Sequence, residues 1–372
     1  MQPKNILITG GAGFIGSHLT DKLINEGYHV RIFDNLEEQV HGGKKPEYLN
    51  PKVEFILGDV TDREALKVAM KGMDVIYHLA SAVGVGQSQY QIKHYVDASV
   101  GGTANLLDIM VNDDIRPQKM IVAASMSSYG EGLYECNKCG KVRPELRAKE
   151  DIESGEWEPK CPNCGARVKA IPTPETEAQY CNSIYALTKK VQEDMMMNIG
   201  ITYDIPTVAL RLFNVYGPRQ SLSNPYTGVA AIFSSRIKND NQPTIFEDGL
   251  QSRDFISVFD VADAFYQGMV NPKADYQIFN IGCGTPLSIK GVAEVLAELF
   301  EKDIQPEITG KFRKGDVRHC YADMTKAKEL LGWEAKVSFA DGMRQLAEWG
   351  KEEESVDSVD QAIEEMKAKG LV

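Results

Sequence analysis

The sequence predicts an α/β fold, a doubly wound parallel sheet with a smaller C-terminal lobe and a cysteine-rich insertion. Three observations support this prediction. Apolar runs of strand length alternate with segments of helical period through the first 135 residues, which is typical of parallel sheets covered by helices. A glycine-rich turn follows the first apolar run. A polar segment rich in Cys, Pro and Gly then interrupts the alternation over residues 136–170.

The individual elements follow from the periodicity of the apolar residues. Strands are predicted, in chain order, over residues 5–9, 29–34, 53–57, 75–79, 119–124 and 206–212. Helices are predicted over residues 14–26, 96–112 and 185–198. A further helix should begin at Thr61, because Thr61 and Glu64 have the spacing of a capping box.

The composition is that of a globular protein, with 43% hydrophobic and 25% charged residues among 372. A net charge of -12 argues against binding to nucleic acid or anionic membranes, since both require clustered Lys and Arg. Apolar stretches are too short to span a bilayer, and the N-terminus does not resemble a secretory signal. An odd count of seven Cys favours reduced thiols or metal ligation over disulfides, so we expect a cytoplasmic protein.

The glycine-rich turn, Thr9 to Gly16, has the pattern of a dinucleotide site. Gly10, Gly13 and Gly16 allow a tight turn and close approach of the backbone to a pyrophosphate at a helix N-terminus. Asp34 ends the second predicted strand, where a carboxylate accepts hydrogen bonds from the ribose hydroxyls and repels a 2′-phosphate. The sequence therefore predicts a Rossmann-type domain that binds NAD rather than NADP. Asp59 either contacts the adenine or caps the next helix.

The domains are predicted from these motifs and from the frequent Pro and Gly residues after Asn214, which indicate a loop-rich region. The predicted ranges are 1–135 and 171–214 for the NAD-binding domain, with 256–285 returning to it, 136–170 for the insertion, 215–255 and 286–350 for a substrate-binding lobe, and 351–372 for a charged, helical, solvated tail.

A second motif suggests acid–base chemistry. Tyr185 and Lys189 are four residues apart on a predicted helix and therefore share a face. A Lys ammonium beside the phenol should lower the pKa of Tyr185 toward neutrality, so that it can act as a base. A Tyr and a Lys at this spacing are common on helix surfaces. Upstream, however, Ser125 ends a predicted strand, and its hydroxyl could hold the same substrate oxygen that Tyr185 would deprotonate.

Several motifs occur together in a fixed order, namely TGGAGFIG (9–16), FDNL (33–36), GDV (58–60), YHLAS (77–81), SMSSYG (125–130), YALTK (185–189), RLFNVYGP (211–218), SRDFI (252–256) and GDVRHCYAD (315–323). With them the chain resembles the extended short-chain dehydrogenase/reductase superfamily, in particular nucleotide-sugar epimerases of the UDP-galactose 4-epimerase kind. The resemblance covers nearly the whole chain except residues 136–170 and the tail.

The resemblance implies a role for each matching position. Ser125, Tyr185 and Lys189 match the catalytic group. The positions matching NAD contacts are Gly10, Gly13, Phe14, Ile15, Gly16, Asp34, Asn35, Asp59, Val60, Leu79, Ala80, Tyr185 and Lys189. The positions matching contacts to a nucleotide-diphosphate sugar are Val83, Ser127, Asn214, Arg219, Arg253, Arg313 and Asp316. The resemblance also implies a homodimer, formed through the helices near 96–112 and 185–199.

The implied reaction is epimerisation at C4 through a 4-keto sugar, with NAD recycled and Tyr185 as acid and base. Dehydratases of the superfamily carry an Asp-Glu pair after the catalytic hydroxyl, where this chain has Met126 and Ser127. The missing acids weigh against a dehydratase, and the absence of Glu at 127 weighs against a decarboxylase. A 4-ketosugar reductase and a non-catalytic NAD-binding regulator remain as alternatives.

The insertion carries two knuckles of similar sequence, each a Cys pair followed by Gly. Cys136, Cys139, Cys161 and Cys164 could supply four thiolates to a closed tetrahedral site, which favours structural zinc in a zinc-ribbon module. Redox dithiols are the alternative. This insertion resembles the subset of the family usually labelled dTDP-L-rhamnose 4-epimerase. It should lie near the mouth of the active site, as a lid or as a subunit contact.

Overall fold

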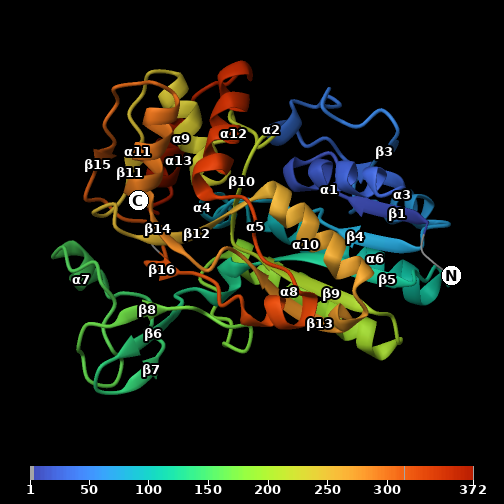
Figure 1. Cartoon of the computed structure of the whole chain (residues 1–372), viewed down its shortest axis with the longest axis horizontal. Coiled ribbons are helices and arrows are strands. Elements are labelled where there is room, and N and C mark those ends of the chain that lie inside the picture. The colour runs from blue at the N-terminus through green and yellow to red at the C-terminus, as the bar shows by residue number, and fades with distance from the viewer. Residues whose placement is uncertain (1–3, 314, 372) are drawn as a thin grey trace.

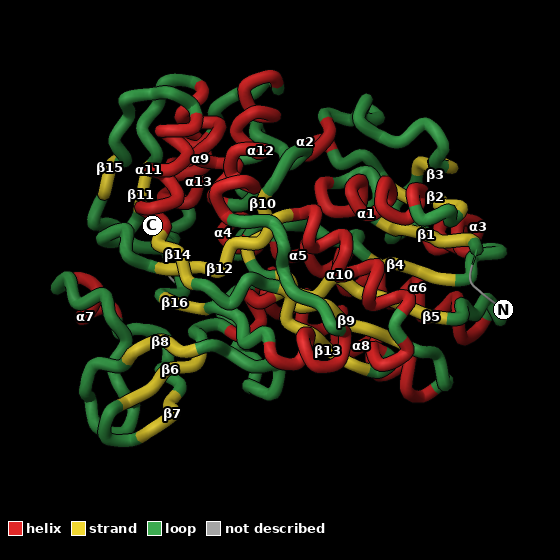
Figure 2. The backbone as a smooth tube through the Cα atoms, in the orientation of Figure 1, coloured by secondary structure: helices red, strands yellow, loops and turns green. Residues whose placement is uncertain are grey.

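The computed structural model describes residues 4–313 and 315–371. Its described residues form a central sheet of seven parallel strands in the order β13-β9-β5-β4-β1-β2-β3 (Figures 1 and 2). These strands are β1 (Asn5–Thr9), β2 (His29–Asp34), β3 (Glu54–Leu57), β4 (Val75–His78), β5 (Lys119–Ser125), β9 (Thr207–Leu212) and β13 (Gln277–Ile281). The fold class and the order of elements predicted from the sequence are confirmed for this Rossmann-type sheet.

Helices cover both faces of the sheet and supply two apolar cores. The longer ones are α1 (Phe14–Asn25), α3 (Arg63–Met70), α6 (Gly102–Asn112), α8 (Ile184–Thr202) and α10 (Val258–Val270). α1 and α10 pack on one face, with Leu19 and Phe265 in its core. α3, α6 and α8 pack on the other face, with Leu106 and Met196 in its core. A π-helical turn, η1 (Val96–Gly101), leads into α6.

Smaller elements complete this part of the chain. They are α2 (Glu38–His41), α4 (Val85–Ser88), α5 (Ile92–Tyr95), η2 (Met126–Tyr129), η3 (Pro272–Ala274) and η4 (Ala327–Leu331). The predicted capping box at Thr61 is wrong. Asp62 is the N-cap of α3 and accepts hydrogen bonds from the N–H groups of Glu64 and Ala65, since its carboxylate is a strong helix cap. The Thr61 hydroxyl instead donates to Asp59.

In its described residues, the C-terminal lobe has two small sheets and a core of its own. One sheet consists of β10 (Asn214–Tyr216), β12 (Ser252–Ser257), β14 (Pro286–Ser288) and β16 (His319–Cys320), and the other of β11 (Thr244–Ile245) and β15 (Glu307–Ile308). Its helices are α9 (Val229–Lys238), α11 (Ile289–Leu299) and α12 (Phe339–Glu352). Phe233, Leu296 and Leu346 pack together in this core.

The insertion projects from the lower left of Figure 1, beside β14 and β16. It contains β7 (Gly140–Val142) and α7 (Lys149–Glu153). In the sequence, β6 (Leu133–Cys136) precedes it and β8 (Lys169–Ile171) ends it. The three strands form one antiparallel sheet with β6 in the centre. A small cluster of Tyr134, Val142 and two of its cysteines forms its interior.

The predicted solvated tail is a packed element. α13 (Val359–Ala368) buries Val359, Ala362 and Met366 against the rest of the protein. These three residues have helical spacing, so the helix has an apolar face that its high charge obscures in the sequence. Among the described residues, no helix combines the length and apolarity needed to cross a bilayer.

Candidate active site

One cavity of about 1110 Å³ extends along the carboxyl ends of the strands and into the C-terminal lobe. In an open parallel sheet this edge, where the strand order reverses between β1 and β4, is where ligands bind. The predicted residues that line the cavity are Gly10, Gly13, Phe14, Ile15, Gly16, Asp34, Asn35, Asp59, Val60, Leu79, Ala80, Val83, Ser125, Ser127, Tyr185, Lys189, Asn214, Arg253, Arg313 and Asp316. Residues far apart in the chain therefore meet at one place.

Arg219 is the predicted substrate residue that the structure places elsewhere. It lines a separate cavity of about 720 Å³. Its guanidinium pairs with Asp21 at 2.8 Å and lies over the ring of Tyr48. Its backbone has φ +67°, in the left-handed region. The geometry gives Arg219 no role in the larger cavity.

The glycine turn has the close backbone packing that the sequence predicts. Gly10 has φ +71°, and a Cβ there would lie 2.8 Å from the backbone nitrogen of Ala80. A Cβ at Gly16 would lie 2.4 Å from the carbonyl oxygen of Gly10. Neither position can accept a side chain without movement of the backbone, so the N-terminus of α1 stays open to a ligand phosphate.

The carboxylate of Asp34 is fixed by two backbone donors. Ala12 N–H and Leu36 N–H each donate to it at 2.9 Å. The buried carboxylate therefore faces the pocket in one orientation, as recognition of a ribose diol requires. Nearby, Asn35 donates to Asp59 at 2.8 Å. Burial raises the pKa of Asp59, but hydrogen bonds from Thr61 and Asn35 outweigh it and lower the pKa below its ordinary value.

The catalytic candidates converge from a strand end and a helix start. Ser125 is the last residue of β5, and Tyr185 lies in the first turn of α8, whose N-cap Ser183 accepts from Ala186 N–H at 3.1 Å. Burial raises the pKa of Tyr185, while a hydrogen bond with Ser125 lowers it; the net shift is upward. The predicted lowering by Lys189 is therefore wrong for the protein without a dinucleotide, because burial dominates.

Lys189 is buried beneath the pocket. Its ammonium donates to Gln192 at 2.8 Å and to Ser81 at 3.5 Å. Burial lowers the pKa of Lys189 to about 7, although Glu193 opposes the shift. The side chain is therefore close to losing its charge at neutral pH, which weakens its effect on the phenol.

Sequence reasoning missed the partner of this lysine. Gln192 also donates to Thr103 at 3.1 Å and lies 3.3 Å from the ring of His78. His78 in turn bonds Thr9 at 2.8 Å, and burial lowers the pKa of His78 to about 3, so the ring is neutral. This series of hydrogen bonds links Lys189, through Gln192 and His78, to Thr9 at the end of β1. The available signal was the position of Gln192 three residues after Lys189, on the same helix face.

Farther along the pocket, the substrate candidates form a polar wall. Arg313 pairs with Asp316 at 2.9 Å and lies over the ring of Phe246. Burial raises the pKa of Asp316, but Arg313 and Arg253 outweigh it and lower that pKa. The buried side-chain oxygen of Asn214 finds no hydrogen-bond partner among the described residues, so a ligand donor could satisfy it.

The four cysteines of the insertion are gathered at one point. Their sulfur atoms all lie within 4.8 Å of one another, and those of Cys136 and Cys164 are 3.6 Å apart. Tetrahedral zinc with Zn–S bonds of ~2.3 Å implies sulfur separations of roughly 3.8 Å, so the residues fit the ion. Gly140 and Gly165 have φ of +73° and +70°, as a left-handed turn after the second Cys requires.

α13 forms part of the pocket wall. Val359, Ala362, Ile363 and Met366 line the cavity. Its Glu365 accepts hydrogen bonds from Tyr90 at 3.0 Å and Tyr226 at 2.6 Å. The helix thus joins a loop of the central domain to a loop of the C-terminal lobe.

Comparison with known proteins gives consistent matches. The model of the NAD dependent epimerase/dehydratase family matches residues 6–282. The dTDP-L-rhamnose 4-epimerase of Burkholderia thailandensis is 33% identical over 353 residues, which is 93% of this chain and 94% of that protein.

Solved structures extend the likeness to the fold. The UDP-glucose 4-epimerase of Thermotoga maritima with UDP-glucose has a TM-score of 0.76 at 32% identity, covering 93% of this chain and 98% of that one. The UDP-glucuronic acid 4-epimerase of Bacillus cereus, in complex with UDP-glucuronic acid and NAD, has a TM-score of 0.77 at 28% identity, covering 93% and 99%.

Proposed function

This chain belongs to the NAD dependent epimerase/dehydratase family, and on that premise we propose that it epimerises a nucleotide-diphosphate sugar at C4 through a 4-keto intermediate. The observation that carries the proposal is the meeting of Ser125, Tyr185 and Lys189 with the glycine turn and the Arg313 wall in one cavity. Relatives of known structure hold NAD and a nucleotide sugar. The residues of the glycine turn and Asp34 fit NAD, whose chemistry when bound is to accept and return a hydride.

The residues of this chain supply proton transfer and orientation. Tyr185 removes the proton from the C4 hydroxyl during oxidation and returns it during reduction, while Ser125 hydrogen-bonds the same oxygen. Arg253 and Arg313 hold the diphosphate, for which guanidinium geometry is suited. Val83 borders the sugar at the edge of the pocket. The 4-keto sugar turns over within the cavity before its other face is reduced.

Two of the rival reactions, dehydration and decarboxylation, need a carboxylic acid beside the catalytic serine. Met126 and Ser127 follow the catalytic serine, and Ser127 donates its hydroxyl to Ser125 at 2.9 Å. No carboxylic acid is available there for elimination of water, so a 4,6-dehydratase or a decarboxylase is disfavoured. A 4-ketosugar reductase would consume reduced dinucleotide in proportion to product, and a non-catalytic regulator would not need Tyr185.

The testing experiment is incubation of the purified enzyme with a panel of UDP-, dTDP-, GDP- and CDP-sugars, with NMR of the product stereochemistry. We expect one substrate to reach a mixture of C4 epimers with no net change in NAD. Stoichiometric consumption of NAD(P)H would establish a reductase, and loss of water or CO₂ from the sugar would establish a dehydratase or decarboxylase.

We propose that Cys136, Cys139, Cys161 and Cys164 hold one structural zinc ion. Their sulfur atoms lie within 4.8 Å of one another, as four ligands of one ion require. A closed four-sulfur site leaves no position for catalysis. Elemental analysis should give one zinc per chain, and Cys139→Ser should lose most of it; a metal-free protein with an unchanged melting temperature contradicts the site.

We also propose a homodimer and a cytoplasmic location. Ile92, Val96 and Leu187 are exposed apolar side chains on α5, η1 and α8, which pack beside one another. An apolar face on these helices is what a four-helix contact between subunits would cover. Sedimentation equilibrium tests the dimer, and Leu187→Glu should shift it to monomers. None of the seven cysteines, all within the described range, forms a disulfide, which suits a reducing compartment.

Deletion of residues 358–372 should cause the enzyme to lose its dinucleotide during purification. α13 closes the pocket over the glycine of α4, where Met366 lies against Gly86. Without it, a ligand in the pocket has a wider exit. The measurement is the NAD content after gel filtration, and we expect the truncated protein to require added NAD for activity. The full-length control Lys367→Ala, which alters an exposed pair with Glu364, should retain NAD. Equal NAD content in the truncated and intact proteins contradicts this role.

A further inference from the structure

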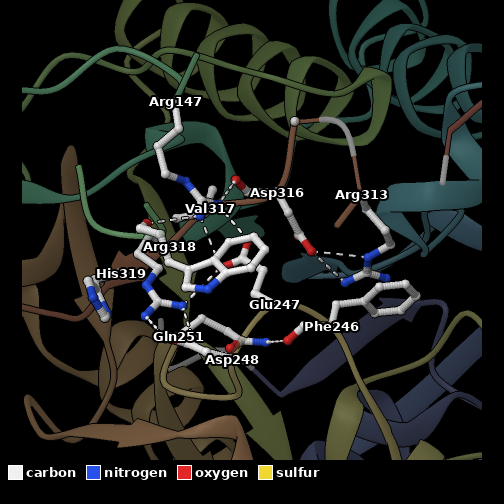
Figure 3. A network of polar contacts seen from close by, with 12 residues as sticks. Arg147, Phe246, Glu247, Asp248, Gln251, Arg313, Asp316, Val317, Arg318 and His319 are labelled. Atoms are coloured by element: carbon white, nitrogen blue, oxygen red, sulfur yellow. Dashed lines mark hydrogen bonds and ion pairs between the residues drawn. The ribbon is translucent and has the colours of Figure 1, made fainter. Parts of the chain in front are cut away.

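Charged side chains of the insertion join a network that reaches the wall of the pocket. Among the described residues, none from 136–170 lines the main cavity, so the insertion is not a lid over it. Instead, side chains of the insertion meet the segment 316–319, whose Asp316 pairs with Arg313 (Figure 3). The network therefore connects the cysteine module to the wall of the pocket.

Arg147 of the insertion makes the most direct link. It forms a two-pronged pair with Glu247 of the C-terminal lobe, at 2.9 Å and 2.7 Å. The same guanidinium donates to the carbonyl oxygen of Asp316 at 3.1 Å. Both side chains of the pair are almost fully buried, and Glu247 has φ +58°, a left-handed backbone that the surrounding contacts must hold in place.

Arg318 gives the segment a second anchor in the same network. It is completely buried and pairs with Glu247 at 2.9 Å and with Asp248 at 2.7 Å. Glu158 of the insertion accepts from Arg318 at 2.7 Å and bonds His319 at 3.0 Å. The insertion therefore supplies one buried cation, Arg147, and one partly exposed anion, Glu158, to this network.

Arg253, which lines the pocket, also contacts the backbone of this segment. Arg253 donates to the carbonyl oxygens of Val317 at 2.5 Å and Arg318 at 3.0 Å. Consecutive carbonyls at 316, 317 and 318 thus accept hydrogen bonds from the guanidinium groups of Arg147 and Arg253. This arrangement holds the backbone from Asp316 to Arg318, and with it the carboxylate that pairs with Arg313.

We propose that Arg147 is a positioning residue through which the cysteine module sets the affinity for the anionic nucleotide part of the substrate. The proposal rests on the proposed function, since it takes Arg313 and Arg253 to be the groups that hold this part. Arg147 does not touch the ligand. It acts through Asp316 and Glu247, so its loss should weaken binding and leave the chemistry at Tyr185 unchanged.

The test compares Arg147→Met with Arg167→Met in the full-length protein. Arg167 belongs to the same module, but its side chain is 70% exposed and pairs with Glu156 at the surface. In Arg147→Met, Glu247 keeps Arg318 as a partner. Glu131, which Arg147 approaches at 3.9 Å, keeps hydrogen bonds from the Tyr134 hydroxyl and from the N–H groups of Arg318 and His319. The readouts are binding of UDP, dTDP, GDP and CDP by calorimetry, KM and kcat, and the zinc and NAD contents.

For Arg147→Met we expect Kd for the nucleotide and KM for the sugar substrate to rise roughly tenfold. We expect kcat within about threefold of wild type, with zinc and NAD unchanged. Arg147→Lys should be intermediate, because an ammonium cannot reproduce both prongs of the pair. Arg167→Met should bind as wild type does.

Unchanged nucleotide affinity in Arg147→Met overturns the proposal, as does a fall in kcat at constant KM. Where Arg147→Met does not fold, Glu158→Gln takes its place, with a smaller rise in Kd expected; wild-type affinity there overturns the proposal equally. Failure of the wild-type protein to bind any of the four nucleotides contradicts the proposed function itself, and this is visible before any variant is compared.

Discussion

Tyr185→Phe should lower kcat by roughly 10² to 10⁴-fold, the range found when a general acid–base group is removed. The phenylalanine keeps the packing at the start of α8 and removes only the hydroxyl that hydrogen-bonds Ser125. Bound NAD and the melting temperature should therefore stay near wild type. The measurement is the initial rate of epimer formation under saturating substrate. Tyr276→Phe, on an exposed turn, serves as the matched control and should retain full activity.

The pH profile adds a second readout for the same variant. Burial raises the pKa of Tyr185, so the phenolate is scarce near neutral pH in the protein without ligand. The kcat/KM of the wild-type enzyme should therefore increase with pH through the neutral range, and this limb should vanish in Tyr185→Phe. Activity of Tyr185→Phe within threefold of wild type would remove this residue from the mechanism.

Glu193→Gln should destabilise the fold by about 3–5 kcal/mol, the usual result of breaking a buried ion pair on one side. Arg211 donates to Glu193 at 2.9 Å and 2.6 Å, and both side chains are buried. The pair joins α8, which carries Tyr185, to β9. Replacement of Glu193 leaves the guanidinium of Arg211 without a counter-charge in the interior.

Chemical denaturation measures this effect as the free energy of unfolding. The double variant Glu193→Met with Arg211→Met should recover a large part of the loss, because neither charge is then left alone. Glu26→Gln, which removes an exposed partner of Lys22, should leave the stability close to that of the wild type. A loss no greater for Glu193→Gln than for Glu26→Gln contradicts the assigned importance of the buried pair.

The sheet and the dinucleotide turn could be predicted because their signals are local. The apolar runs of β1 and β2 and the glycines between them fall within 30 residues, and each carries its own conformational demand. The tight contacts at Gly10 and Gly16 follow the spacing of the motif. The sequence predicts Thr61 as the helix cap because two residues that can cap a helix are adjacent there. In the structure Asp62 is the cap, since its carboxylate accepts two backbone N–H groups.

The remaining features depend on contacts between distant residues. Arg147 and Glu247 are 100 residues apart, and no local pattern indicates that they pair. The raised pKa of Tyr185 depends on how deeply the pocket buries the phenol, which spacing alone does not reveal. Arg219 follows a family motif closely, yet its side chain turns to Asp21 in a different cavity.

In the proposed mechanism, one hydride leaves C4 of the sugar and returns to the same carbon while the cofactor stays bound. The direct test uses the sugar nucleotide identified by the panel, labelled with deuterium at C4, in ordinary water. The account predicts that the epimerised product retains the deuterium at C4, as seen by NMR and mass spectrometry. Loss of the label to solvent, or its recovery in free dinucleotide, would contradict the account.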